Sequence, residues 1–328
     1  MPHRRPLLTH LATLGTLALA GLLPAGAALA QDFPSKTVKF IVPFPPGSAT
    51  DTSARYFAKK FTDITGQTVV VDNKAGGNGF IAVRAVLSAP ADGYTVFIGS
   101  NSTLAVNAAL FKQLPYDPVA DFSPLSMLTR TPALLIVPGS SEHKTLKDLA
   151  AAARAKPGQL NFGAGSAGYQ LMAEAFNEAA NVQSTHVPFK GASEAVTAVS
   201  AGTVDFSFVE IMSALELVKS GKLRALAVAS ERRPAAVPHV PTAGEAGLPG
   251  FTAYAWVAAM VSAKTPKAET DKLASLFSTI ERLPETREFY ERTGAEVMNG
   301  GPEEMRAFQN AEIKLWKRIA AQAKVELQ

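Results

Sequence analysis

No cysteine occurs in the sequence, so the folded protein depends on its core rather than on disulfides. Histidine is scarce as well, with 5 residues and no His-x-x-x-His spacing that would favour a metal ion. The 32 basic residues barely outnumber the 28 acidic ones and form no basic block that would hold a nucleic acid backbone. We therefore expect no bound metal, no cofactor and no nucleic acid partner.

Long apolar runs are also lacking beyond the first 30 residues, and none approaches the roughly 20 residues that span a bilayer. The N-terminal segment has Arg4 and Arg5 before the apolar run Leu11–Leu23, and the small-x-small pattern Ala28-Leu29-Ala30 follows. This order predicts a secretory signal peptide over residues 1–30, cleaved after Ala30, with export by the Sec or the twin-arginine route. Since no cysteine is available for a lipid anchor, we expect a soluble protein of a Gram-negative periplasm.

The mature chain has the composition of a well-packed protein, with 47% hydrophobic and 18% charged residues. Loss of Arg4 and Arg5 takes 2 from the 32 basic residues, so the mature net charge falls from +4 to +2. Strand-like and helix-like runs alternate from Val38 to about Val228, a rhythm typical of βαβ units and a parallel sheet. The length suits two α/β lobes.

Proline-rich stretches indicate where the chain passes between these lobes. Three prolines between Pro115 and Pro124 predict an irregular connection before a strand at Ala133–Val137. A second cluster lies within 232–250, and the helical patterns 265–283, 285–293 and 303–323 follow it. We therefore assign residues 31–131 and 250–328 to lobe 1 and residues 132–249 to lobe 2, with the ligand in the cleft between them.

Three loops rich in Ser, Thr and Gly follow predicted strands: Gly47–Asp51, Ser100–Thr103 and Gly165–Gly168. A strand that ends in such a loop and leads into a helix presents free N–H groups and the positive end of the helix dipole at one place. Each loop taken alone is equally compatible with an ordinary βα connection. Together, on both lobes, they predict a site of uncharged donors that binds a carboxylate and releases it unchanged.

Two motifs in the third loop indicate other functions. Gly163-x-Gly165-x-x-Gly168 matches a dinucleotide-binding fingerprint, but the following strand, within 184–189, lacks the acidic residue that would bind the ribose. Ser166 lies in a stretch close to a nucleophile elbow, with Asp205 and His239 after it in the order of a serine hydrolase. That order is common in long chains, and His239 lies in a proline-rich crossing.

Several stretches resemble the Bug family of periplasmic solute receptors, which serve tripartite tricarboxylate transporters. The matching stretches cover essentially the whole mature chain in family order: Phe33–Lys36, Pro43–Arg55, Asn73–Gly79, Ala91–Thr95, Val187–Gly191, Gly221–Val228 and Val240–Phe251. The resemblance implies a type II, two-lobed "Venus flytrap" periplasmic binding protein without catalytic activity. It also implies that one ligand carboxylate is held by the first-lobe loop.

Two positions depart from the family pattern, and both concern the ligand. Tyr169 replaces a frequent His, and Glu210 replaces a frequent Asp or Asn. The tyrosine suits a larger or aromatic acid, whereas the glutamate would repel a second carboxylate or attract an amine or amide. The full set of expected ligand contacts is Phe44, Gly47, Ser48, Ala49, Thr50, Asp51, Ser100, Ser102, Thr103, Ser166, Ala167, Gly168, Tyr169, Lys190 and Glu210.

The sequence therefore predicts a monomeric periplasmic receptor that captures a mono- or dicarboxylate, with aromatic acids among the candidates, and delivers it to the permease subunits of a tripartite tricarboxylate transporter. Two alternatives stay open at this point. One is a ligand-sensing receptor of a signalling system, and the other is a secreted serine hydrolase that uses Ser166.

Overall fold

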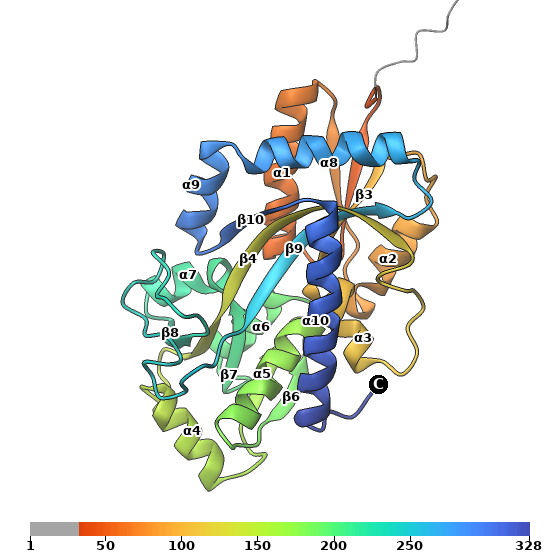
Figure 1. Ribbon diagram of the computed structural model, residues 1–328. Helices are drawn as coiled ribbons and strands as arrows, with labels where there is room; N and C mark the ends of the chain where they lie inside the picture. Colours follow the sequence, from red (N-terminus) through yellow and green to blue (C-terminus); the bar gives the residue numbers. More distant parts are fainter. Residues whose placement is uncertain (1–32) are drawn as a thin grey trace, which may run out of the picture.

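In the computed structural model, which describes residues 33–328, ten strands form one continuous, strongly curved sheet with helices on its faces (Figure 1). The strand order is β2-β1-β3-β9-β4-β7-β5-β6, and β8 and β10 also pair with β4. The predicted signal peptide lies outside the described residues. Within residues 33–328, no helix has the length and apolarity needed to cross a bilayer.

The first lobe is built on the strands at one end of this sheet. The apolar, β-branched strand β1 (Val38–Val42) is central to it and pairs in parallel with β2 (Val69–Asn73) and β3 (Thr95–Ser100). Phe40 on β1 packs in an aromatic cluster with Phe57 and Phe277. The helical elements of this lobe are α1 (Ala49–Thr65), η1 (Gly77–Gly79), α2 (Phe80–Leu87), η2 (Ser102–Val106), α3 (Asn107–Leu110), α8 (Lys267–Glu281) and α9 (Pro284–Thr293).

The second lobe is built on the other end of the sheet. The strand β5 (Asn161–Ala164) pairs in parallel with both β6 (Thr185–Pro188) and β7 (Phe206–Glu210). The strand β8 (Leu223–Val228) lies antiparallel to β4. The helices of this lobe are α4 (Leu146–Ala155), α5 (Ala167–Ala179), α6 (Ala192–Ser200) and α7 (Ile211–Lys219).

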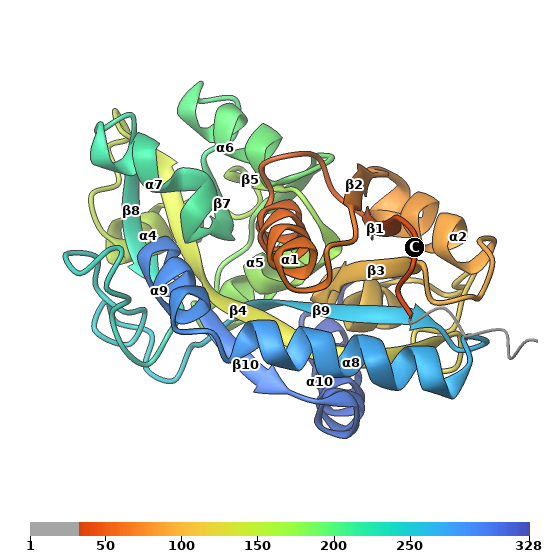
Figure 2. The ribbon, with the colours of Figure 1, turned by 90° about the horizontal axis from the view of Figure 1, so that it is seen from above.

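The long strand β4 (Phe122–Pro138) joins the two lobes (Figure 2). Its first part pairs with β9 (Tyr254–Ser262), whereas its residues from Ala133 onward pair with β7 and β8. The prediction of an irregular connection that includes Pro124 is wrong for that residue. Pro124 lies inside β4, at a point where the pairing register with β9 shifts. Proline is tolerated within a sheet at such bulges.

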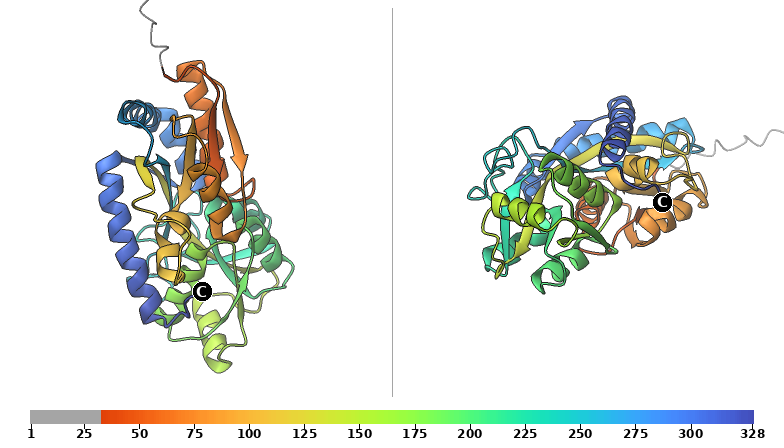
Figure 3. Two further views of the ribbon diagram at one scale, coloured as in Figure 1. Left: turned by 90° about the vertical axis from the view of Figure 1, so that its right-hand side faces the viewer. Right: turned by 90° about the horizontal axis from the view of Figure 1, so that it is seen from below.

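The sheet is mixed rather than parallel throughout, because β4, β8, β9 and β10 (Glu296–Gly300) all pair in the antiparallel sense. The strand β10 lies between the helical patterns 285–293 and 303–323, where the sequence predicted no strand. The last helix, α10 (Pro302–Gln322), extends along the outer side of both lobes and packs against η2, α3 and α5 (Figure 3). It therefore spans the lobes without entering the space between them.

Candidate functional site

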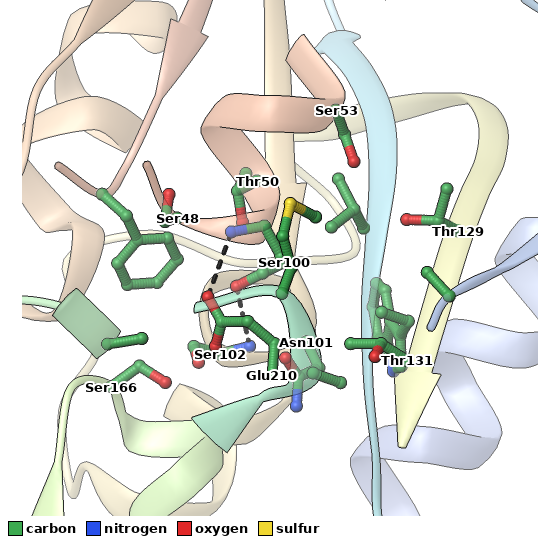
Figure 4. Close-up of a pocket in the computed structure, with 18 of the residues that line it drawn as sticks. Ser48, Thr50, Ser53, Ser100, Asn101, Ser102, Thr129, Thr131, Ser166 and Glu210 are labelled. Carbon is green, nitrogen blue, oxygen red and sulfur yellow. Dashed lines mark hydrogen bonds between the residues drawn. The ribbon is translucent and has the colours of Figure 1, made fainter. Parts of the chain in front are cut away.

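A cavity lies where the two lobes meet, beside the starts of α1 and α5 and the ends of β3 and β7 (Figure 4). Its free volume is about 40 Å³, enough for a few water molecules. Most of its polar lining consists of hydroxyl groups. The lining residues are Phe44, Ser48, Ala49, Thr50, Ser53, Ser100, Asn101, Ser102, Thr129, Thr131, Gly165, Ser166, Tyr169, Ala192, Glu210, Met212, Ala255, Trp256, Val257, Tyr290, Thr293 and Ala295.

The start of α1 forms one wall of this cavity. Ser48 has an extended backbone and caps the helix, and its hydroxyl accepts a hydrogen bond from the Asp51 amide at 3.2 Å. The first turn of a helix has no internal partners for its N–H groups, and it carries partial positive charge. The Thr50 amide and hydroxyl therefore present donors to the cavity, and the Ala49 amide donates to Glu210 of the opposite lobe.

Asp51 supports this wall from behind. Its carboxylate accepts hydrogen bonds from the Gly47 amide at 2.9 Å, from Asn73 Nδ2 at 2.8 Å and from Arg55 Nε at 3.0 Å. Burial raises the pKa of Asp51, but the hydrogen bonds from Arg55, Gly47 and Asn73 outweigh it, so the pKa is lowered and the group stays ionised. Asp51 is 3% exposed and does not line the cavity, so it positions the Gly47–Asp51 loop.

The end of β3 supplies a second group of hydroxyls. The Ser100 amide donates to Thr103 Oγ1, and the Ser102 amide donates to Ser100 Oγ, each at 3.2 Å. These bonds hold a tight turn from β3 into η2 and leave the Ser102 hydroxyl facing the second lobe. There, Ser102 Oγ accepts a hydrogen bond from the Gly168 amide at the start of α5, at 3.0 Å.

The second lobe contributes the loop between β5 and α5. Ser166 caps α5, because its hydroxyl accepts from the Tyr169 amide at 3.5 Å. Gly165 leaves space for the neighbouring α6 loop, since a Cβ at Gly165 would lie 2.2 Å from the backbone carbon of Gly191. The close packing of these two loops directs the positive end of α5 toward the first lobe.

Glu210 reaches across the cavity from the end of β7 (Figure 4). Its Oε1 accepts hydrogen bonds from the Ala49 amide of the first lobe at 3.1 Å and from Ser213 Oγ at 3.0 Å. Its Oε2 is buried and has no hydrogen-bond partner among the described residues. Burial, then the negative charge of Glu210 and a hydrogen-bonding contact with its carboxylate, raise the pKa of the neighbouring Tyr169 hydroxyl, which therefore stays protonated.

Two direct hydrogen bonds thus join the lobes at the cavity, one from Ala49 to Glu210 and one from Gly168 to Ser102. Among the described residues that line the cavity there is no Lys, Arg or His, and Glu210 is the one charged side chain. An anion in this space would be held by backbone amides, hydroxyls and helix ends. Such a site suits an anion bound through neutral donors.

The structure brings nine of the expected contact residues to the cavity: Phe44, Ser48, Ala49, Thr50, Ser100, Ser102, Ser166, Tyr169 and Glu210. Five others lie directly beside it in the same loops and helix starts, namely Gly47, Asp51, Thr103, Ala167 and Gly168. Lys190 is exposed and lines a neighbouring surface pocket rather than the cavity. Contact between any of these expected residues and a ligand stays a prediction.

Part of the cavity wall was missed by sequence reasoning. Thr129 and Thr131 lie two residues apart on β4, so both side chains point from the same face of the strand. Two threonines at this spacing indicate a pair of hydroxyl groups on one face of a strand. The signal was missed because this strand was expected to begin only at Ala133. Trp256 and Tyr290 also line the cavity, from β9 and α9, two elements far along the chain from the predicted loops.

The arrangement around Ser166 differs from that of a serine hydrolase. Its hydroxyl caps α5, the Asp205 carboxylate accepts from the Asn161 amide at 2.6 Å, and His239 is exposed in a loop. Within residues 33–328, no group of three or more metal-binding side chains is present. The fingerprint Gly163-x-Gly165-x-x-Gly168 leads into α5 and forms part of the cavity described here.

Comparison with known proteins defines the family. Residues 53–325 match the model of the tripartite tricarboxylate transporter family receptor, TctC. The chain belongs to the TctC family. Protein BugT of Bordetella pertussis is 34% identical over 325 residues, which cover 97% of this chain and 98% of BugT. The resemblance to Bug receptors is therefore confirmed.

Solved structures of related proteins extend this assignment to the fold. The structure described as R. palustris Rpa4515 with adipate has a TM-score of 0.87 and 31% identity, covering 90% of this chain and 100% of that one. MatC of Rhodopseudomonas palustris with bound malate has a TM-score of 0.82 and 32% identity, covering 88% and 99%. Periplasmic binding protein BugD has a TM-score of 0.84 and 28% identity, covering 90% and 100%. The predicted two-lobed periplasmic binding protein fold is confirmed, and this TctC receptor is a solute-binding protein of a transport family.

Proposed function

We propose that this TctC receptor captures a small mono- or dicarboxylate in the periplasm and delivers it to the permease subunits of a tripartite tricarboxylate transporter. It acts as a monomer, without a cofactor and without catalysis, after removal of the signal peptide at Ala30. Residues 31–131 and 250–328 move as one lobe and residues 132–249 as the other, and closure of the lobes on the ligand creates the surface that the permease recognises.

The observation that carries this proposal is the set of uncharged donors that converge on the cavity from both lobes. The first lobe supplies the start of α1 and the Ser100 and Ser102 hydroxyls, and the second supplies Ser166 and the start of α5. Since the donors come from both sides, an anion between them links the lobes. The cavity holds about 40 Å³ in this closed arrangement, so the lobes must separate for an acid to enter.

The ligands named for two relatives support the carboxylate class. Adipate accompanies the R. palustris protein, and malate is bound to MatC. Both compounds are dicarboxylates without a positively charged group. They support binding of an acid by this chain, whereas the residues of its own cavity decide which acid is preferred.

A thermal-shift screen of the purified mature chain tests the proposal. Mono- and dicarboxylates, aromatic acids and neutral sugars are compared, and at least one acid is expected to raise the melting temperature in a concentration-dependent manner. Thr50→Val, which removes a cavity hydroxyl at nearly constant volume, should reduce that shift. Thr270→Val, at a half-buried position in the first turn of α8 that does not line the cavity, is the matched control. Tight binding of a neutral sugar, with no response to any acid, would contradict the proposal.

Cells that lack the gene test the delivery step. Loss of uptake of the identified acid, restored by the wild-type gene but not by a binding-deficient variant, is the expected result. Retained uptake together with loss of ligand-dependent gene induction would assign the receptor to sensing instead.

A further inference from the structure

Glu210 adds a negative charge to the cavity, which a receptor that binds only simple carboxylates does not need. Its side chain is 3% exposed, it is the one charged group among the described lining residues, and no basic side chain accompanies it there. A carboxylate that is buried without a cationic neighbour is costly unless its charge is otherwise satisfied. The two oxygens of Glu210 are satisfied to different degrees.

Oε1 of Glu210 is well satisfied, whereas Oε2 is not. Oε1 accepts from the Ala49 amide and from Ser213 Oγ, at 3.1 and 3.0 Å, and the starts of α1 and α7 add partial positive charge. Oε2 is buried, and no donor among the described residues meets hydrogen-bond geometry with it, although the protonated Tyr169 hydroxyl lies beside the carboxylate. Buried acceptors in proteins are normally paired, so Oε2 marks a position where a donor belongs.

The same cavity also contains an unpaired donor. Asn101 is 3% exposed and lines the cavity at the end of β3, and its Nδ2 has no hydrogen-bond partner within residues 33–328. The hydroxyls of Ser48, Thr50 and Ser166 add further donors nearby (Figure 4). A ligand that satisfies this cavity therefore needs an acceptor group for Asn101 and the hydroxyls, and a donor group for Glu210.

We propose that Glu210 Oε2 accepts a hydrogen bond from a protonated amine of the ligand, so that this receptor selects small amino-carboxylates over dicarboxylates. The inference rests on the proposed function, and it specifies the chemical class of the ligand. The ligand carboxylate lies against the start of α1 and the hydroxyls, and its ammonium group lies against Glu210. A second carboxylate would instead face Glu210 with no cation in between.

The charge balance favours the same class. A zwitterion adds no net charge to a cavity that already holds one carboxylate, whereas a dicarboxylate adds two negative charges beside it. A hydrogen bond between charged partners is stronger than one between neutral groups. We expect an amino-carboxylate to bind at least tenfold more tightly than the dicarboxylate of similar length, which corresponds to about 1.4 kcal/mol.

Calorimetric titrations with matched acids test this inference. The first set is succinate, 4-aminobutyrate and butyrate, and the second is adipate, 6-aminohexanoate and hexanoate. All three compounds of a set have a carboxylate at one end. At the other end they carry a carboxylate, an ammonium or a methyl group, respectively. For the wild type, the amino acid of at least one set should bind best and the dicarboxylate worst.

Two variants separate the charge of Glu210 from the shape of the cavity. Glu210→Gln keeps an acceptor for Ala49 and removes the charge, so it should abolish or reverse the preference for the amine. Ser213→Ala removes a hydrogen bond to Oε1 but keeps the charge, so it should retain the preference. Melting curves of both variants confirm that each is folded.

The outcomes distinguish this inference from the proposed function. Binding of succinate or adipate at least as tightly as the amino acids, or an unchanged preference in Glu210→Gln, would overturn the role of Glu210 and leave the carboxylate receptor intact. Failure of all six acids, when other carboxylates stabilise the protein, would likewise overturn it. No response to any carboxylate would instead contradict the proposed function itself.

Discussion

Replacing Gly168 by alanine should weaken ligand binding without destabilising either lobe. Gly168 is the second residue of α5, and its amide donates to Ser102 Oγ of the opposite lobe. A Cβ at this position would lie 2.7 Å from Asn101 Nδ2 and 2.9 Å from Ser102 Oγ, where ordinary contacts begin at 3.4 Å. The closed lobes would therefore have to separate locally by 0.5–0.7 Å, or distort two buried side chains.

The size of the effect follows from the cost of overpacking. An extra methyl group in a tightly packed region costs about 1–3 kcal/mol. Here that cost falls on the closed form alone, because the open lobes separate Gly168 from Asn101 and Ser102. Binding requires closure, so the dissociation constant should rise by roughly 5- to 150-fold. Alanine is favoured over glycine in helices by up to about 1 kcal/mol, so the melting temperature without ligand should stay equal or increase.

Calorimetry with the best acid from the thermal-shift screen, together with melting curves without ligand, measures both effects. Gly244→Ala is the matched control, because the nearest atom to its new Cβ would be 3.8 Å away and its backbone is not in the left-handed region. Gly191→Ala provides an independent test at the same interface, since its Cβ would lie 2.8 Å from Cδ of Pro45. An unchanged dissociation constant for Gly168→Ala would refute the reasoning. A parallel loss of melting temperature and affinity would also do so, because the clash would then be present without ligand.

Three further predictions concern stability, loop geometry and detection of binding. Burial raises the pKa of Glu281 from 4.5 to about 8, so the folded state favours its protonated form. The free energy of unfolding, measured with urea, should fall by about 3–5 kcal/mol between pH 4.5 and 8, and Glu281→Gln should remove most of that slope. Asp51→Asn removes the charge and leaves one of the three donors (Gly47 N, Arg55 Nε and Asn73 Nδ2) facing an NH2 group, so it should loosen the Gly47–Asp51 loop and weaken binding about tenfold, and an unchanged affinity in calorimetry would contradict this role. Trp256 lines the cavity, so its fluorescence should change on ligand addition in a Trp316→Phe variant, and a silent titration with a ligand that calorimetry detects would contradict its placement.

Local sequence signals predict most of the elements that position the site. The β-branched run Val38–Val42 is β1 with the same bounds, and Ser48 caps α1 as its side chain suggests. The capping pattern at Thr145 and Asp148 likewise starts α4, with both reciprocal hydrogen bonds present. Such signals involve residues that are close together in the chain. They can therefore be recognised in a single sequence without knowledge of the fold.

The features that sequence reasoning missed depend on pairing between distant segments. β4 is continuous across both lobes because β9, more than a hundred residues later, supplies its partner, and nothing near Pro124 indicates this. The parallel sheet expected from the βαβ rhythm is mixed for the same reason. The contact from Ala49 to Glu210 joins residues of opposite lobes, so the sequence indicates that Glu210 is unusual but not which amide it meets.

The central claim is that uncharged donors of both lobes enclose a small acid between them. A crystal structure of the mature protein, grown with the carboxylate that stabilises it most, tests this claim most directly. We predict a ligand carboxylate within hydrogen-bonding distance of the first turn of α1 and of hydroxyls from both lobes, with the lobes closed around it. A ligand bound on an outer surface, or held by Lys190 with the cavity unchanged, would contradict the account.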